Sequence, residues 1–153
     1  MLIGRRTVTV AWGDCDPAGI VFFPRYFEWF DASTAALFEQ AGLPKPAMLA
    51  RFDIVGIPLV DARATFMKPS SFGDRVVIDT LVAEWRRSSF EVRHRLLRGD
   101  QLAVEASETR VWAERAPDGG IRSRAIPPEV VRLFGDADGP AEAGLHDGNS
   151  IGP

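Results

Sequence analysis

Two carboxylates separated by one residue, Asp14 and Asp16, precede the most helical stretch of the sequence, which begins near Pro24. A carboxylate beside a polarised carbonyl group can attack the carbonyl carbon, or act as a general base on a water molecule. The first turn of a helix carries unpaired N–H groups and a positive dipole end, which stabilise an oxyanion. Aspartates before a helix also commonly make turn hydrogen bonds, so spacing alone allows a catalytic or a structural role.

Other common chemistries have few residues to support them. Cys15 lacks a partnered base, because the only histidine in the region expected to fold is His94, in an apolar-alternating strand where a core or interface histidine is expected. We interpret Cys15 as a packing residue. One cysteine and two histidines cannot build a Cys/His zinc site, and EF-hand spacing and a G-x-S-x-G motif are absent. A cation site made of carboxylates alone stays open, but we expect no metal and no cofactor.

The element that must position the carboxylates is an amphipathic helix expected from Pro24 to Gly42. Proline suits the first helical turn, because its missing N–H would have no partner there. Gly42 can take the left-handed conformation that ends a helix, and Pro44 prevents continuation. Apolar residues recur at helical spacing, so one face must be buried. This stripe consists of Phe27, Phe30, Leu37, Phe38 and Ala41.

Extended runs account for most of the remaining chain. In the run 75–84, Val76, Ile78, Thr80 and Val82 alternate with more polar residues, which is typical of a strand with one buried face. One helix followed by adjacent strands predicts an α+β domain with an antiparallel sheet, not an alternating α/β fold. The expected strands are 5–12, 54–66, 75–84, 88–98 and 101–114, with a hairpin turn at 99–100 and a short helix at 45–52.

The length and the charge of the chain limit the possible number of domains and the possible partners. The 153 residues fit one domain, expected at 1–134, followed by a flexible tail at 135–153 that is rich in Gly, Ala, Asp and Pro. Four of the 21 acidic residues lie in this tail, so the domain is nearly neutral and no nucleic-acid partner is expected. The sequence has no secretory signal and no apolar run long enough for a membrane span, which predicts a cytoplasmic protein without a membrane partner.

Three motifs make the chain resemble a known family. They are G-D-C-D-P-A-G-I-V-F-F-P-R-Y-F at 13–27, I-V-G-I-P at 54–58 and E-W-R-R-S-S-F at 84–90. Together they resemble the 4-hydroxybenzoyl-CoA thioesterase family of the hotdog fold, over about residues 8–127. The resemblance implies a five-stranded antiparallel sheet wrapped around one long helix, in a homodimer that assembles into a homotetramer. It also implies hydrolysis of an aromatic acyl-CoA, first among them 4-hydroxybenzoyl-CoA, to the free acid and coenzyme A.

The same resemblance assigns catalytic roles. It makes Asp16 the catalytic carboxylate, usually as a nucleophile, although a general-base role stays open. It makes the backbone N–H of Phe23 the oxyanion donor, which Pro24 cannot replace because it has no N–H. Asp14 is given a structural role in the loop. Relatives often carry Tyr where this chain has Phe23, so a side-chain hydroxyl is missing there.

Substrate contacts follow from the resemblance as well. Asp31 matches a position that can contact the ring hydroxyl of a 4-hydroxybenzoyl group, with a plain surface or interface carboxylate as the equal alternative. Arg86 and Arg87 match a basic run that holds coenzyme A phosphates, although they could simply be solvated arginines at a hairpin. Ser88 replaces a third basic residue. The acyl pocket, expected between two subunits, would be lined by Ile20, Phe22, Tyr26, Asp31, Gly56 and Pro58.

Two alternative functions remain at this point. One is a thioesterase of the same fold that acts on other aryl or short aliphatic acyl-CoAs, because Phe23 and Ser88 depart from the 4-hydroxybenzoyl pattern. The other is a non-catalytic module that binds acyl-CoA.

Overall fold

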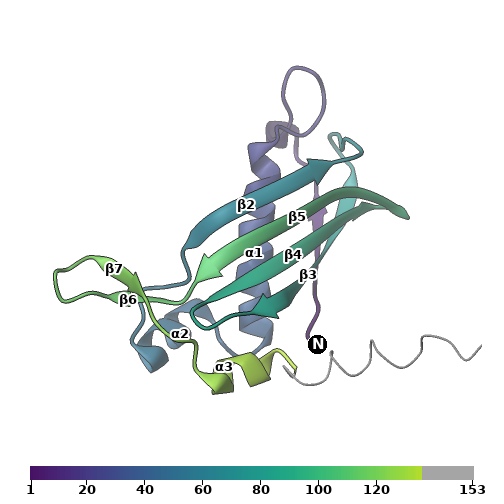
Figure 1. The fold of residues 1–153 in the computed structure, drawn as a ribbon. Helices are drawn as coiled ribbons and strands as arrows, with labels where there is room; N and C mark the ends of the chain where they lie inside the picture. The colour runs from purple at the N-terminus through teal and green to yellow at the C-terminus, as the bar shows by residue number, and fades with distance from the viewer. Residues whose placement is uncertain (136–153) are drawn as a thin grey trace, which may run out of the picture.

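The centre of the protein is a five-stranded antiparallel sheet with one long helix, α1, packed across its inner face (Figure 1). A computed structural model describes residues 1–135, so the predicted tail lies outside the described residues except for Gly135. The strand order is β1-β3-β4-β5-β2. The elements are β1 (Gly4–Thr9), the 3-10 turn η1 (Trp12–Asp14), α1 (Pro24–Gln40), α2 (Lys45–Phe52), β2 (Leu59–Phe66), β3 (Arg75–Trp85), β4 (Ser89–Arg98), β5 (Gln101–Val111), β6 (Ala113–Arg115), β7 (Ile121–Ser123) and α3 (Pro128–Leu133).

The ends of α1 lie where the sequence predicted them. Pro24 is its first residue and Phe23 its N-cap, and Gly42 follows the C-cap Ala41 with a φ of 86°. This positive φ is why a glycine ends the helix. The predicted apolar stripe is confirmed, except that Phe27 is only half-buried. The buried residues within α1 are Tyr26, Phe30, Ser33, Thr34, Leu37 and Phe38.

The sheet directs alternate side chains toward α1, and the alternation predicted for β3 is confirmed. Val76 and Ile78 are fully buried, and they pack in the same cluster as Phe30 of the helix. On β4 and β5 the inward set also includes polar side chains, namely His94, Glu108 and Arg110. The helix and the sheet therefore enclose both an apolar core and a line of buried polar groups.

The last predicted strand is a single run, 101–114, but the chain breaks it in two. β5 ends at Val111, and the Trp112 amide then donates to the Ser88 carbonyl (2.8 Å), away from the β2–β5 ladder. Trp112 and Ala113 are both buried, so the inside–outside alternation stops here. β6 pairs with β7 in a separate two-stranded sheet. The first predicted strand, 5–12, likewise ends early at Thr9 and is followed by η1.

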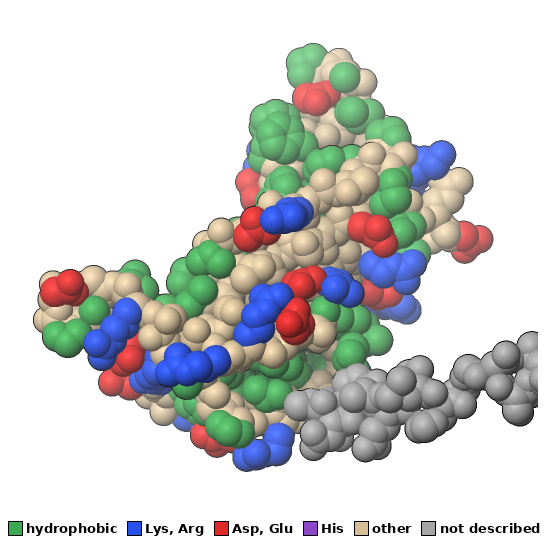
Figure 2. All heavy atoms as spheres, viewed as in Figure 1, with side chains coloured by type: hydrophobic (Ala, Val, Ile, Leu, Met, Phe, Trp, Pro, Cys, Tyr) green, Lys and Arg blue, Asp and Glu red, His purple; other side chains and the backbone are tan. Residues whose placement is uncertain are grey.

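The outer face of the sheet and the edge strand β2 are not covered by any other described element. Figure 2 shows acidic and basic side chains interspersed over the outer face. Seven of the eight residues of β2 are exposed, and an exposed edge strand is a template for pairing with another chain.

Among residues 1–135 no helix is long and apolar enough to cross a membrane. The cytoplasmic location stays a prediction.

Candidate active site

The segment from Asp14 to Phe22 forms a narrow loop whose two sides pair with each other. The Phe22 amide donates to the Asp14 carbonyl (2.8 Å), and the Asp16 amide donates to the Ile20 carbonyl (3.0 Å). α1 begins at Pro24, only two residues after Phe22. The backbone pairing therefore holds the Asp16 residue beside the start of the helix.

Two further backbone hydrogen bonds attach this loop to the sheet. The Val21 amide donates to the Ser70 carbonyl (2.8 Å), and the Val10 amide donates to the Asp74 carbonyl (2.8 Å). Both acceptors lie in the connection that enters β3 at Arg75. The loop is thus fixed to the end of the sheet where β3 begins. Cys15 is half-buried and packs against the core around Val21, as expected for a packing residue.

Asp16 itself makes one side-chain hydrogen bond. Its Oδ1 accepts from the Ala18 amide (2.8 Å), and its carbonyl accepts from the Gly19 amide (2.9 Å). Gly19 has a φ of 82°, which the tight turn requires. Oδ2 has no hydrogen-bond partner among residues 1–135, and the side chain is half-buried. Asp16 therefore combines the turn geometry with one carboxylate oxygen that remains available for a reacting group.

Asp14 has the structural role predicted for it. Its Oδ2 accepts a hydrogen bond from the Ala11 amide (2.8 Å), which closes the turn η1. Its Oδ1 lies 3.9 Å from Nε of Arg25 in the first turn of α1. Both contacts hold the loop in place.

The N–H of Phe23 is the donor available at the helix start. Phe23 has a φ of −53° and a ψ of −33°, so the chain is already helical before Pro24. The amides of Arg25 and Tyr26 donate to the carbonyls of Phe22 and Phe23, at 2.9 and 3.1 Å. The Phe23 amide has no acceptor among the described residues. This N–H and the helix dipole together make the helix start suitable for an oxyanion.

The predicted apolar lining of this loop divides into exposed and buried members. Ile20, Phe22 and Phe23 are 39%, 46% and 59% exposed, and the two phenyl rings contact each other edge to face. Tyr26 is instead 4% exposed and packs against Trp29 in the core. Burial raises the pKa of its hydroxyl. Tyr26 therefore lies behind the loop, while the other three side chains form an apolar surface on the loop that carries Asp16.

Asp31 lies two turns further along α1, on its exposed side. It lies eight positions after Phe23, which is about 12 Å along a helix axis. Its Oδ1 accepts a hydrogen bond from Nη2 of Arg110 (2.7 Å). The Asp31 side chain is 71% exposed, whereas that of Arg110 is 7% exposed. The carboxylate thus sits at the surface end of a buried guanidinium group.

A buried polar network lies behind this ion pair, and the sequence analysis did not predict it. Nε of Arg110 donates to Oε2 of Glu108 (2.9 Å), which also accepts from Oγ1 of Thr34 (3.0 Å). Nε2 of His94 lies 3.5 Å from Oε1 of Glu108, and its Nδ1 lies 2.8 Å from Oγ1 of Thr80. Nε2 also lies 3.4 Å from Oγ1 of Thr34, so both ring nitrogens have a polar partner. His94 is therefore a hydrogen-bonded core histidine, as expected.

The 54–58 segment reaches the same network through its backbone. The Ile57 carbonyl accepts from Nη1 of Arg110 (3.3 Å), and the Pro58 carbonyl accepts from the Val111 amide (3.0 Å). Gly56 is buried and pairs with Ala113 in an isolated bridge. Gly56 and Pro58 therefore lie beside the end of β5, close to Asp31.

The predicted phosphate-binding residues form the turn between β3 and β4. Arg86 is ion-paired with Glu84 (2.7 Å) and lies 3.6 Å from Glu91. Arg87 is exposed, and no carboxylate among the described residues pairs with it. Ser88 is half-buried, and its carbonyl accepts from the Trp112 amide. Arg87 is thus the arginine of this turn that is available to an anion.

Within one subunit the predicted site residues fall into two groups. The catalytic group, Asp16, Ile20, Phe22 and Phe23, lies at the end of the sheet where β3 begins. The distal group lies toward the end where β3 stops (Figure 1). β3 is 11 residues long, which corresponds to about 36 Å at the usual rise of a strand, so the 86–88 turn lies far from the catalytic group, whereas Asp31 lies about 12 Å from Phe23 along α1. The distal group comprises Asp31, Gly56, Pro58, Arg86, Arg87 and Ser88.

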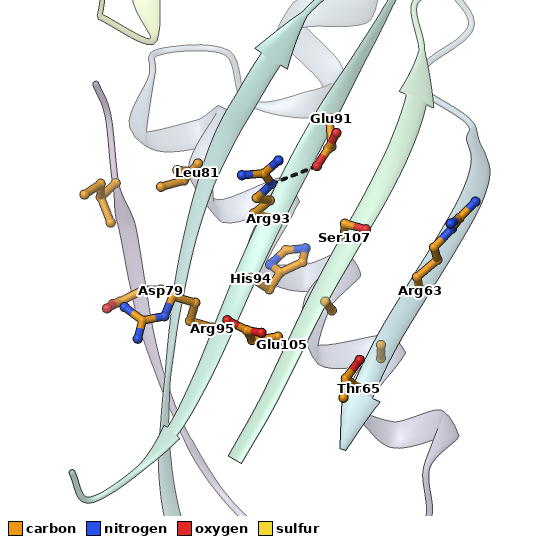
Figure 3. Close-up of a pocket in the computed structure, with 13 residues that line it drawn as sticks. Arg63, Thr65, Asp79, Leu81, Glu91, Arg93, His94, Arg95, Glu105 and Ser107 are labelled. Carbon is orange, nitrogen blue, oxygen red and sulfur yellow. Dashed lines mark hydrogen bonds and ion pairs between the residues drawn. The ribbon is translucent and has the colours of Figure 1, made fainter. Parts of the chain in front are cut away.

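The structure also has a cavity that belongs to neither group. It is a shallow hollow of about 690 Å³ on the outer face of the sheet, where Arg93, Arg95 and Glu105 point away from α1 (Figure 3). None of the predicted site residues lines it. Among residues 1–135 no group of three or more His, Cys, Asp or Glu side chains is arranged to hold a metal ion. The residues that offer chemistry are those around Asp16 and Arg110.

A five-stranded antiparallel sheet curved around one long helix, with a carboxylate loop at the helix start, defines the hotdog class of thioesterase folds. A family model described as the thioesterase-like superfamily matches residues 10–134. The chain belongs to this superfamily, and it is an acyl-CoA thioesterase. The alternative of a non-catalytic binding module is therefore set aside.

Individual relatives support this assignment. The chain is 42% identical over 133 residues to the 4-hydroxybenzoyl-CoA thioesterase of Pseudomonas sp. (strain CBS-3), which covers 81% of this chain and 92% of that protein. The crystal structure of an aspartate-to-asparagine mutant of a 4-hydroxybenzoyl CoA thioesterase, complexed with 4-hydroxybenzoyl CoA, matches with a TM-score of 0.80, 34% identity and coverage of 88% and 99%. A gentisyl-coenzyme A thioesterase matches with a TM-score of 0.73, 30% identity and coverage of 86% and 99%.

Proposed function

We propose that the protein hydrolyses an aromatic acyl-CoA, first among them 4-hydroxybenzoyl-CoA, to the free acid and coenzyme A. The observation that carries this proposal is that one oxygen of Asp16 and the N–H of Phe23 both lack a hydrogen-bond partner among residues 1–135, and that both residues belong to the short segment leading into α1. The similarity to the Pseudomonas enzyme supports the choice of acyl group. The substrate complex of the related enzyme was obtained with a mutant that lacks one carboxylate, which is consistent with a carboxylate catalyst.

The chemistry assigns each group one task. The thioester carbonyl oxygen accepts a hydrogen bond from the Phe23 N–H, which stabilises the negative charge that develops on it. Oδ2 of Asp16 attacks the carbonyl carbon, the C–S bond breaks, and coenzyme A leaves as a thiolate that needs no strong acid assistance. Water then hydrolyses the acyl-aspartyl anhydride. In the general-base alternative, Asp16 instead takes a proton from the attacking water, and the Phe23 N–H keeps its role.

The two groups of site residues support a pocket shared between two subunits. Asp31 is about 12 Å from Phe23 along the same helix, which is longer than a single benzoyl ring, so it cannot contact the ring hydroxyl of an acyl group bound at its own Phe23. Pairing of the exposed β2 edges of two subunits would bring the catalytic group of one toward the distal group of the other. The homodimer is thus the functional unit of this proposal. The uncovered outer sheet face leaves room for assembly of dimers into the predicted homotetramer.

The β3–β4 turn within the distal group supplies the contacts for the coenzyme. Arg87, exposed at the β3–β4 turn, binds a phosphate of coenzyme A, and Arg86 contributes while it is also paired with Glu84. Ser88 offers only a hydroxyl where the family resemblance leads us to expect a third basic residue, so this turn binds the nucleotide with fewer charges. Ile20, Phe22 and Phe23 supply apolar surface for the acyl group, and Tyr26 supports that surface from behind.

The test of this proposal is a comparison of acyl groups. Turnover of 4-hydroxybenzoyl-CoA, benzoyl-CoA and butyryl-CoA is measured under the same conditions. The proposal predicts the highest kcat/KM with the hydroxylated aryl thioester and the lowest with the butyryl thioester. Equal values for all three would contradict the aryl assignment and favour a thioesterase of broader specificity.

A further inference from the structure

The geometry points to Arg110 as a positioning residue that makes Asp31 selective for a hydroxyl group on the acyl ring. This inference rests on the proposed function, because it concerns the aryl group of that substrate. Arg110 does not touch the substrate. It acts by fixing the position of the Asp31 carboxylate relative to the 54–58 segment.

Each terminal or bridging nitrogen of Arg110 has its own acceptor. Nε donates to Glu108 (2.9 Å), Nη2 donates to Asp31 (2.7 Å) and Nη1 donates to the Ile57 carbonyl (3.3 Å). The guanidinium group therefore joins three elements, since Glu108 is on β5, Asp31 is on α1 and Ile57 precedes β2. Two of these three partners belong to or adjoin the proposed acyl pocket. A planar guanidinium can make these contacts simultaneously, whereas an ammonium group cannot reproduce their fork geometry.

The buried side of the network keeps Arg110 rigid. Burial alone would raise the pKa of Glu108, but hydrogen bonds and charge from His94 and Arg110 outweigh it and lower that pKa to about 2. Glu108 is therefore ionised and binds Arg110 at neutral pH. Glu108 is also held by Thr34, and the His94 ring stacks on Phe30 at 4.7 Å. The side chain of Arg110 is thus ordered before any ligand arrives.

The exposed side of the network is open to a ligand. Most surface ion pairs must order two flexible side chains and therefore contribute little to stability. In this pair Arg110 is already ordered, so only the short Asp31 side chain remains to be ordered. Oδ1 of Asp31 is occupied by Arg110, and Oδ2 has no partner within residues 1–135. An ionised carboxylate can only accept hydrogen bonds. The site therefore favours an acyl ring with a donor such as a phenol O–H over an unsubstituted ring.

The experiment measures this preference without relying on turnover. Unreactive thioether analogues of coenzyme A that carry a 4-hydroxyphenyl or a phenyl group are titrated into the wild type and two variants, Arg110→Lys and Asp31→Asn. The wild type is expected to bind the hydroxylated analogue about tenfold more tightly, and this preference should fall to threefold or less in both variants. Arg5→Lys is the matched control, because Arg5 forms an ion pair with Asp79 on the outer face (2.7 Å), and it should keep the wild-type preference.

The outcomes separate this inference from the proposed function. If Arg110→Lys weakens both analogues equally, or only lowers Tm, Arg110 is structural and the inference is overturned. If the wild type shows no preference, the inference is also overturned, even if 4-hydroxybenzoyl-CoA is hydrolysed. Loss of the preference in Asp31→Asn and in Arg110→Lys, without further loss in the double variant, would support the inference even where hydrolysis proved to favour another thioester. Asp31 is exposed, so its variant remains informative if Arg110→Lys fails to fold.

Discussion

The amide of Phe22 donates to the carbonyl of Asp14 at 2.8 Å, and this hydrogen bond closes the carboxylate loop directly against the helix start. Its consequence is preorganisation, because the hydrogen bonds of the loop and of the first turn of α1 fix the backbone on both sides of Phe23 and leave its N–H free of any acceptor among residues 1–135. Groups fixed in this way stabilise a developing charge without reorganising at the moment of reaction. In the proposed mechanism the loop therefore contributes to catalysis through its backbone as well as through its side chains.

The role of the Phe23 backbone predicts a contrast between two substitutions. Phe23→Pro removes the N–H at a φ of −53°, which proline can adopt, so kcat should fall by about 10²-fold to 10³-fold. Phe23→Ala keeps the N–H and should retain kcat within about tenfold, although KM can rise as apolar contact is lost. Steady-state kinetics and circular dichroism of both variants check this. Equal losses in the two variants would contradict a backbone oxyanion donor.

The proposed phosphate contacts predict an effect on binding, not on chemistry. Arg87→Ala should raise KM for acyl-CoA about tenfold, or about 1.4 kcal/mol, and leave kcat nearly unchanged. Arg86→Ala should have a smaller effect, because Arg86 already pairs with Glu84. Ser88→Lys should lower KM. The control substrate is the matching pantetheine thioester, which lacks the nucleotide, and a variant that raised KM equally for both substrates would contradict phosphate binding.

The buried Glu108 predicts an acid-dependent loss of stability. Its pKa falls from 4.5 to about 2 on folding, so its contribution is present above pH 4.5 and is lost as the pH falls toward 2. Such a decrease corresponds to about 3 kcal/mol of unfolding free energy. Glu108→Gln should therefore be less stable than the wild type by that order at pH 7, and the difference should shrink by pH 3.5.

Urea unfolding at fixed protein concentration measures this difference at both pH values. The control is Glu105→Gln, since Glu105 lies on the same strand but on the outer face, and its variant should match the wild type at both pH values. A Glu108→Gln difference that stayed constant between pH 7 and pH 3.5 would contradict the lowered pKa.

The proposed sharing of the pocket between two subunits predicts complementation between two defective variants. Asp16→Asn lacks the catalytic carboxylate, and the double variant Arg86→Ala/Arg87→Ala lacks the phosphate contacts. A mixed dimer contains one site with the native Asp16 of one subunit and the native arginines of the other, because a two-fold dimer has two equivalent sites. Mixing the variants under conditions of subunit exchange should restore activity at low substrate concentration. No gain on mixing would place each complete site within one subunit.

Local signals made the helix and most strands predictable from the sequence. Pro24 and Gly42 have fixed preferences that do not depend on distant contacts, and the alternation from Val76 to Val82 reports one buried face directly. The end of β5 at Val111 was not predictable in this way. It depends on the hydrogen bond between Trp112 and Ser88, which are far apart in the sequence.

The buried network was missed for a related reason. In β5 the inward residues Glu108 and Arg110 and the outward residues Glu105 and Ser107 are all polar, so periodicity does not reveal which face is buried. Only the positions of His94 and Asp31 in the fold show that Glu108 and Arg110 have partners for their polar atoms. The separation of Asp16 from Arg86 likewise follows from the topology of the sheet and has no signal in the motifs.

The most direct test of the catalytic role of Asp16 is the single-turnover rate of 4-hydroxybenzoyl-CoA hydrolysis by Asp16→Asn, measured together with its affinity for the substrate. Asparagine keeps the size of the side chain and can still accept from the Ala18 amide, so the loop should remain intact. We predict a rate reduced by about 10³-fold or more, with an affinity within about threefold of the wild type. A rate within tenfold of the wild type, in a variant that still binds substrate, would contradict the account.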